Sequence, residues 1–212
     1  MLDTVSQLVQ RLRTRYPVVK TQLVHQTPFQ LLIATILSAQ CTDAQVNRVT
    51  PGLFARFPDS ASLAGAKNTT IEKLIFSTGF YRNKTRNIKA CAKAIEERHQ
   101  GIVPRTLEDL TALPGVGRKT ANVLLSTIHG IQTIVVDTHV ARISRRLGLT
   151  ASKNPTAIEF DLMAVLPETD WNDFSLWLIY LGREICRSRN PLCPGCLLED
   201  LCPKVGVPAS SA

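Results

Sequence analysis

Apolar residues recur at helical spacing along almost the whole chain, and the two-residue alternation typical of half-buried strands is rare. Leu8, Val9 and Leu12 form such a stripe in the first segment. Thr27 followed by Pro28 is typical of an N-cap and a first-turn proline, and predicts a buried helix after it. The pattern predicts a compact all-α fold. Further helix starts are expected at Asp43, Ser60, Thr70, Thr106, Asn154 and Asp170, and stops at Gly79, Gly101, Gly130 and Gly148.

The chain carries a surplus of basic residues. Its 25 Lys and Arg outnumber 17 Asp and Glu, which gives a formal net charge of +8 over 212 residues. This surplus favours a polyanionic partner, nucleic acid ahead of an acidic membrane, although a protein can be basic without one. Asp3 stands where an export signal would be basic, and the apolar run 31–37 is too short to cross a bilayer. We expect a cytoplasmic, nucleoid-associated or otherwise intracellular monomer without membrane contact, and a loose tail after Cys202.

Residues 106–129 have the pattern of two short helices joined by a tight turn. Thr106 with an acid three residues later is typical of a capping box, and the string Leu-Pro-Gly-Val-Gly-Arg-Lys-Thr-Ala from Leu113 leads into the second helix. The two glycines permit a sharp turn, and its exposed amides with the N-terminus of the second helix suit a phosphate oxygen. An ordinary glycine-containing turn is the alternative, which the added apolar anchor and cation disfavour. The predicted phosphate-binding residues are Gly115, Val116, Gly117 and Arg118.

Lys119 and Asp137 are the candidate catalytic residues. Lys119 falls in the first turn of the second helix, where the positive end of the helix dipole disfavours an ammonium group and so favours a nucleophilic amine. Asp137 follows the extended apolar run 134–136 and stands at the start of a further helix. The alternatives are a lysine that only binds phosphate and an aspartate that is only an N-cap. His139 is expected to be a hydrogen-bonded supporting residue rather than a base.

Four cysteines lie close together near the C-terminus with the spacing C-x6-C-x2-C-x5-C. In a reducing compartment such a group indicates a metal centre before disulfides. Zinc sites commonly use two short Cys pairs, and this loop has one, so the spacing favours an iron–sulfur cluster only slightly over zinc. Arg187 and Arg189 within the loop are expected to face DNA, and Cys41 and Cys91 to be small core residues. The predicted metal ligands are Cys186, Cys193, Cys196 and Cys202.

Four stretches of the chain form a recognisable combination. They are Leu-Pro-Gly-Val-Gly-Arg-Lys-Thr-Ala-Asn (113–122), Val-Asp-Thr-His-Val (136–140), Leu-Leu-Ile-Ala-Thr-Ile-Leu-Ser-Ala-Gln (31–40) and the cysteine loop. With them, and over nearly its whole length, the sequence resembles the endonuclease III family of helix-hairpin-helix DNA glycosylases. The resemblance implies a bifunctional DNA glycosylase and abasic-site lyase of base excision repair. Its expected substrate is double-stranded DNA that carries oxidised pyrimidines or abasic sites.

The same resemblance implies two helical lobes that flank a DNA-binding cleft. One is a six-helix barrel carrying the helix-hairpin-helix, at residues 22–131. The other is discontinuous, with residues 1–21 and 132–212, and its loop 186–202 holds a [4Fe–4S] cluster rather than zinc. In the family this cluster takes no part in base excision and orders a basic loop against DNA.

The mechanism that the resemblance implies assigns roles to individual residues. Lys119 attacks C1′ of a flipped-out nucleotide, and the resulting Schiff base leads to β-elimination. Asp137 stabilises positive charge on the sugar and helps to activate the lysine. Gln40 fills the gap left by the flipped base, and Ser38 and Asp43 form a supporting polar pair. Helix-surface or capping roles are the alternatives for these last three.

Two positions depart from the family pattern. Phe80 stands at the bulky wedge position where well-known relatives carry Leu, so opposite-strand contacts and lesion preference can differ. Thr111 stands where some relatives have an acid, which can alter the proton-transfer network.

Two other readings compete with a bifunctional enzyme. Mismatch-type and adenine glycosylases generally lack the lysine, and the adenine-specific ones carry an extra C-terminal domain. A non-catalytic DNA-binding protein whose cluster senses redox state would use the hairpin and the cysteine loop, but it would not need Lys119 and Asp137 together.

Overall fold

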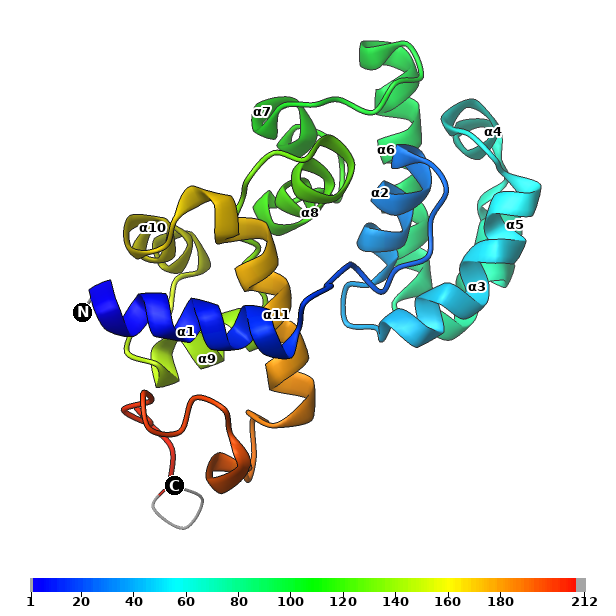
Figure 1. Cartoon of the computed structure of the whole chain (residues 1–212). Coiled ribbons are helices and arrows are strands. Elements are labelled where there is room, and N and C mark those ends of the chain that lie inside the picture. The colour runs from blue at the N-terminus through cyan, green and yellow to red at the C-terminus, as the bar shows by residue number, and fades with distance from the viewer. Residues whose placement is uncertain (1, 209–212) are drawn as a thin grey trace. The chain divides into compact units, whose positions relative to one another are not determined.

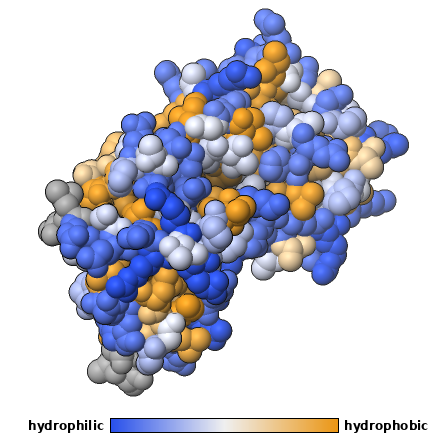
Figure 2. All heavy atoms as spheres, viewed as in Figure 1, coloured by the Kyte–Doolittle hydropathy of each residue, from blue (hydrophilic) through white to orange (hydrophobic). Residues whose placement is uncertain are grey.

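The computed structural model describes residues 2–208, and every regular element in that part of the chain is a helix (Figure 1). The predicted all-α fold is confirmed. The chain divides into two compact units: one runs from Thr21 to Ile131, and the other joins the stretch up to Lys20 with the stretch from Gln132 onward. No helix among the described residues has the length and apolar character that crossing a membrane requires. On the face that Figure 2 shows, hydrophobic residues form small groups separated by hydrophilic ones.

The unit 21–131 is built around α2 (Pro28–Leu37), which buries eight of its ten residues. A helix that is apolar on every side must be central, and α2 packs against α3 (Asp43–Arg56), α6 (Tyr81–His99) and α8 (Arg118–His129). As predicted, Thr27 is the N-cap, and its side chain accepts a hydrogen bond from the Gln30 amide. The remaining elements are α4 (Ser60–Gly65), α5 (Asn68–Ile75), the 3-10 turn η1 (Phe76–Thr78) and α7 (Leu107–Thr111).

The other unit is built around α11 (Trp171–Glu184), whose Phe174 and Trp177 are buried. The indole Nε1 of Trp177 donates a hydrogen bond to the Tyr16 carbonyl at 3.0 Å, which fastens the end of the N-terminal helix to α11. This bond joins segments 161 residues apart, so the unit is discontinuous in sequence. Its other elements are α1 (Leu2–Arg15), α9 (Thr138–Arg146), α10 (Pro155–Val165) and the 3-10 turns η2 (Glu168–Asp170) and η3 (Cys193–Gly195).

Most helix boundaries follow local signals, but two predicted details are wrong. α5 begins at Asn68 rather than at Thr70, with Lys67 as an N-cap that makes no side-chain bond. Thr106 caps α7 as predicted, but the Asp109 carboxylate accepts from the Thr106 hydroxyl at 2.7 Å, where a capping box uses the backbone amide. The starts predicted at Asp43, Ser60, Thr106, Asn154 and Asp170 lie within one residue of the observed ones.

The segment after Cys202 is held more firmly than predicted. The Val205 amide donates to the Arg146 carbonyl at 3.1 Å, and the Lys204 amine lies 3.3 Å from a Glu199 carboxylate oxygen. Both contacts anchor the segment to its own unit. Residues 209–212, which are also expected to be loose, lie outside the described part of the chain.

Candidate active site and nucleic-acid interface

The turn between α7 and α8 has one glycine that the backbone requires. Gly115 adopts a φ of +78°, and a Cβ there would lie 2.9 Å from the Asn87 Cβ on α6. Any other residue would be strained in conformation and would also press on α6. Val116 is buried, and its amide donates to the Leu113 carbonyl at 3.1 Å. The predicted apolar anchor of the turn is therefore present.

Gly117 serves a different purpose from Gly115. It is the N-cap of α8 with an extended φ of −96°, and a Cβ there would meet open space. The expectation that both glycines permit the sharp turn is therefore wrong for Gly117. Neither conformation nor packing requires glycine here, so the missing side chain leaves the backbone open to a ligand. Because α8 has no side-chain cap, its first amides suit an anion, and the half-buried Arg118 adds charge beside them.

Lys119 is the second residue of α8, and its side chain is exposed. No other described residue forms a hydrogen bond or ion pair with its amine. The dipole disfavours a cation in the first turn of a helix, and no partner offsets that cost here. Such a conflict between residue type and local stability is typical of functional positions. The amine is available to a ligand that approaches the start of α8.

Asp137 is the N-cap of α9, which the sequence predicted as the alternative to a catalytic role. It follows an extended segment in which Val135 donates a backbone hydrogen bond to the Ser175 hydroxyl at 2.9 Å. Its Oδ1 accepts hydrogen bonds from the amides of His139 and Val140, each at 2.8 Å. The two bonds to one oxygen hold the half-buried carboxylate in a single orientation. They also give it a structural role, which a variant meant to test its charge alone must preserve.

His139 lies between α9 and α11. Burial lowers its pKa below the ordinary value, and Arg142 and Arg183 lower it further against the opposing effect of Asp137. A neutral imidazole is therefore favoured. Arg142 Nη2 lies 3.2 Å from His139 Nδ1 and donates to the Cys186 carbonyl at 2.9 Å. His139 is thus in contact with an arginine that also holds the start of the cysteine loop.

An open pocket in this unit is strongly cationic. Three arginines, a histidine and two hydroxyl residues line it, together with a glycine, and they come from α9, α11 and the cysteine loop. Arg187 and Arg189 of the loop are both exposed, and Arg187 lines the pocket beside α9. A concentration of positive charge of this kind suits a phosphate group. The lining residues are Thr138, His139, Arg142, Gly182, Arg183, Arg187 and Ser188.

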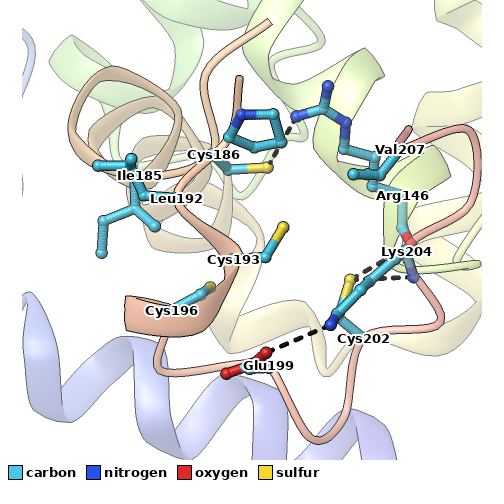
Figure 3. A pocket seen from close by; sticks show the side chains of 11 residues that line it. Arg146, Ile185, Cys186, Leu192, Cys193, Cys196, Glu199, Cys202, Lys204 and Val207 are labelled. Carbon is cyan, nitrogen blue, oxygen red and sulfur yellow. Dashed lines mark hydrogen bonds and ion pairs between the residues drawn. The ribbon is translucent and has the colours of Figure 1, made fainter. Parts of the chain in front are cut away.

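The four cysteines of the C-terminal loop line one small pocket (Figure 3). The side chains of Ile185 and Leu192 form part of its wall. Within residues 2–208, no three His, Cys, Asp or Glu side chains are close enough to form a ligand set as they stand. The sulfurs therefore surround a common space without closing on one point. Cys91 is buried in the core of the unit 21–131, as predicted, whereas Cys41 is half-buried and packs against that core.

Arg146 contacts the cysteine loop, and the sequence did not single it out. It is buried, and its Nη1 donates to Cys186 Sγ at 3.2 Å and to the Arg187 carbonyl at 2.7 Å. The Lys204 amide donates to Cys202 Sγ at 3.4 Å, so a second sulfur also receives a donor. Hydrogen bonds to sulfur stabilise thiolate ligands. The signal in the sequence was the four-residue spacing of Arg142 and Arg146, which places both on one face of α9.

Gln40 and Phe80 are exposed on two strained turns of the unit 21–131. Gln40 has a φ of +52° and Phe80 a φ of +48°, in the left-handed region that non-glycine residues rarely adopt. Phe80 is 62% exposed, although it is a large aromatic residue. Ser38 ends α2, with its hydroxyl bonded to the Thr35 carbonyl at 2.8 Å, and Asp43 begins α3. Strain of this kind in an exposed turn is typical of a functional position.

The structure brings several of the predicted residues together and leaves one pairing open. Residues 115–119 share one turn, Asp137 and His139 share the start of α9, and the four cysteines share one pocket. Lys119 belongs to the unit 21–131 and Asp137 to the other unit, so their joint action stays a prediction.

Comparison with known proteins gives one consistent result. The model of the HhH-GPD superfamily of base excision DNA repair proteins matches residues 33–168. Endonuclease III of Synechocystis sp. is 53% identical, over 91% of this chain and 88% of the relative. Endonuclease III of Escherichia coli strain K12 is 40% identical, over 92% and 93%.

Solved structures agree with the sequence relatives. A trapped endonuclease III–DNA covalent intermediate is 39% identical and superimposes with a TM-score of 0.92 over 96% of each chain. A thermostable thymine-DNA glycosylase, 23% identical, has a TM-score of 0.83 over 94% of each chain and shares the fold.

Proposed function

Because the chain belongs to the HhH-GPD superfamily of base excision DNA repair proteins, and within it to the endonuclease III family, we propose that it excises oxidised pyrimidines from duplex DNA and then cleaves the strand. It is a DNA glycosylase with abasic-site lyase activity. The observation that carries the proposed mechanism is the exposed Lys119 amine, without a partner among the described residues, beside the bare N-terminus of α8.

The Lys119 amine acts as the nucleophile. The damaged nucleotide must leave the stack before C1′ can be reached. Nζ then forms a bond to C1′, the glycosidic bond breaks, and its electron pair departs with the base, which takes up a proton. The nitrogen bound to C1′ then loses a proton, and the C1′–O4′ bond breaks as the C1′=N double bond forms. O4′ keeps the electron pair of the broken bond and takes up a proton, which leaves a Schiff base between Nζ and C1′. Removal of a proton from C2′ then breaks the C3′–O bond, and the 3′ phosphate leaves.

Asp137 supplies the negative charge that these steps need. The bond-breaking step develops positive charge on the sugar, and a fixed carboxylate stabilises it without reorganisation. The same carboxylate can take a proton from the lysine ammonium group. Because Oδ1 is held by two amides of α9, Oδ2 is the oxygen that we assign to this chemistry.

Trapping tests this function directly. Borohydride reduces a Schiff base to a stable amine, so the protein should become covalently attached to a duplex that carries an oxidised pyrimidine or an abasic site. Base release and strand cleavage are scored separately on the same duplexes. A protein that binds these duplexes but neither releases base nor traps would be a non-catalytic binder, and the proposal would fail.

Binding to the DNA backbone is assigned to both units. The turn 115–117 with Arg118 would hold one phosphate, and the cationic pocket with Arg187 and Arg189 would hold others. Each of the variants Arg118→Ala, Arg187→Ala and Arg189→Ala should weaken binding to all sequences and lower the salt-dependence slope by about one unit. Fluorescence anisotropy over a series of salt concentrations measures that slope. The control is Arg56→Ala, at the exposed end of α3. If one of the three variants has the same salt-dependence slope as this control, the arginine that it replaces does not contact DNA.

We infer further that the four loop cysteines hold a [4Fe–4S] cluster. The pocket shared by their sulfurs, its apolar wall and the donors to Cys186 and Cys202 fit such a group. A bound cluster would supply redox-active iron, but no step of base excision passes through it. The role of the cysteines is to tie residues 186–202 into one ordered loop, and so to present Arg187 and Arg189.

Loss of one ligand should therefore affect loop order as well as metal content. The wild type should contain about four iron atoms per chain and absorb broadly in the visible region. Cys202→Ala should lose iron, and limited proteolysis should then cut within residues 186–202. Cys41→Ala is the control and should retain the metal. A zinc content of one per chain without iron would contradict the inference.

A further inference from the structure

Lys84 is a buried lysine without a role in the mechanism. It lies in the first turn of α6 and is only 4% exposed. Both features disfavour a cation, since burial removes water from the ammonium group and the start of a helix is the positive end of its dipole. Burial lowers the pKa of Lys84 below the ordinary value, and the neighbouring Cys41 opposes that shift. An apolar side chain would be more stable at this position, so the charge and the hydrogen-bond donors of Lys84 need an explanation.

The amine of Lys84 is fastened to the turn that carries Phe80. Nζ donates a hydrogen bond to the Thr78 carbonyl at 2.8 Å. Thr78 ends η1, and its own hydroxyl bonds back to the Ile75 carbonyl at 2.8 Å. Gly79 and Phe80 follow, both with positive φ. The lysine therefore holds the backbone two residues before the exposed aromatic ring.

A second contact holds η1 from the side of α3. Gln45 Nε2, near the start of α3, donates a hydrogen bond to the Ser77 hydroxyl at 2.6 Å. Two successive residues before the Phe80 turn are therefore held, Ser77 by Gln45 and Thr78 by Lys84.

We propose that Lys84 is a positioning residue that holds the Phe80 turn, so that the aromatic ring can enter the duplex as the damaged nucleotide leaves it. The inference rests on the proposed function. An aromatic wedge unstacks a base step only if the turn behind it does not yield. A non-glycine residue with a positive φ on an exposed turn, as Phe80 is, would relax without a fixed support. A charge-assisted hydrogen bond to a backbone carbonyl supplies that support, whereas an apolar residue would only fill the space.

The decisive variant is Lys84→Met, which keeps the length and removes the donor. A duplex with a damaged base in a normal pair requires insertion, whereas the same damaged base in an unpaired bulge is already out of the stack. Lys84→Met should lose about 10- to 100-fold in base release on the paired duplex, and no more than a few-fold on the bulge. The fluorescence of 2-aminopurine opposite the lesion, which reports unstacking, should rise less than with the wild type.

Two controls keep the outcomes distinct. Lys93→Met removes an exposed lysine from the same helix and should behave as the wild type on both substrates. Ser77→Ala removes the second contact from an exposed position, and should reproduce a weaker form of the same paired-duplex defect even if Lys84→Met fails to fold. Equal losses on both substrates, or no loss on either, would overturn the positioning role. A wild type inactive on both would instead overturn the proposed function.

Discussion

The Lys119→Ala variant should form no covalent adduct when borohydride is added to a mixture of the protein and a duplex with an abasic site. The adduct requires an amine bonded to C1′, and alanine has none. Strand cleavage should fall by at least about 10³-fold, as expected when the nucleophile of a covalent mechanism is removed. Binding should change far less, because backbone amides and Arg118 hold the phosphate. Gel electrophoresis of the trapped complex and an anisotropy titration measure the two effects.

Lys93→Ala is the matched control for this experiment. Lys93 is an exposed lysine on α6 whose amine lies 3.4 Å from a Glu97 carboxylate oxygen, and the mechanism does not use it. This variant should trap as well as the wild type. If Lys119→Ala still trapped in full yield, another amine would be the nucleophile.

The Asp137→Asn variant should bind DNA but lose about 10²- to 10³-fold in turnover. Asparagine is as good an N-cap as aspartate, because its amide oxygen can accept the same bonds from His139 and Val140. The variant therefore removes the charge and keeps the cap. Its free energy of unfolding should stay within about 0.5 kcal/mol of the wild type. Single-turnover rates of base release and a denaturant titration measure the two quantities.

A second substitution at the same position separates the structural from the chemical role. Asp137→Ala removes both the charge and the cap, and should lower the free energy of unfolding by about 1 kcal/mol in addition. Its rate should match that of Asp137→Asn if the charge alone matters for chemistry. If Asp137→Asn had the turnover of the wild type, Asp137 would act only as the N-cap of α9 and not in the chemistry.

Local signals in the sequence were sufficient for most of the helices and for several site residues. Thr27, Thr106 and Asn154 cap their helices as predicted, because a cap depends on bonds within three residues. The start at Thr70 was misplaced by two residues, since α5 begins after Lys67 without a side-chain cap. The role of Gly117 was also predicted wrongly, since it was expected to permit the sharp turn. Only the tertiary structure shows that a Cβ at this position would meet no neighbouring atom.

The sequence by itself determined which residues can do chemistry: an amine and an aspartate each at the start of a helix, a glycine turn between two helices, and four thiols in a short loop. These features are local, and backbone sterics and neighbouring hydrogen bonds govern them over a few residues. Only the tertiary structure decided that Lys84 is buried and bonded to the turn before Phe80, and that Arg146 donates to a cysteine 40 residues away. Such contacts depend on how distant segments pack. The sequence pattern of one segment does not indicate which charged side chain of another segment will contact it.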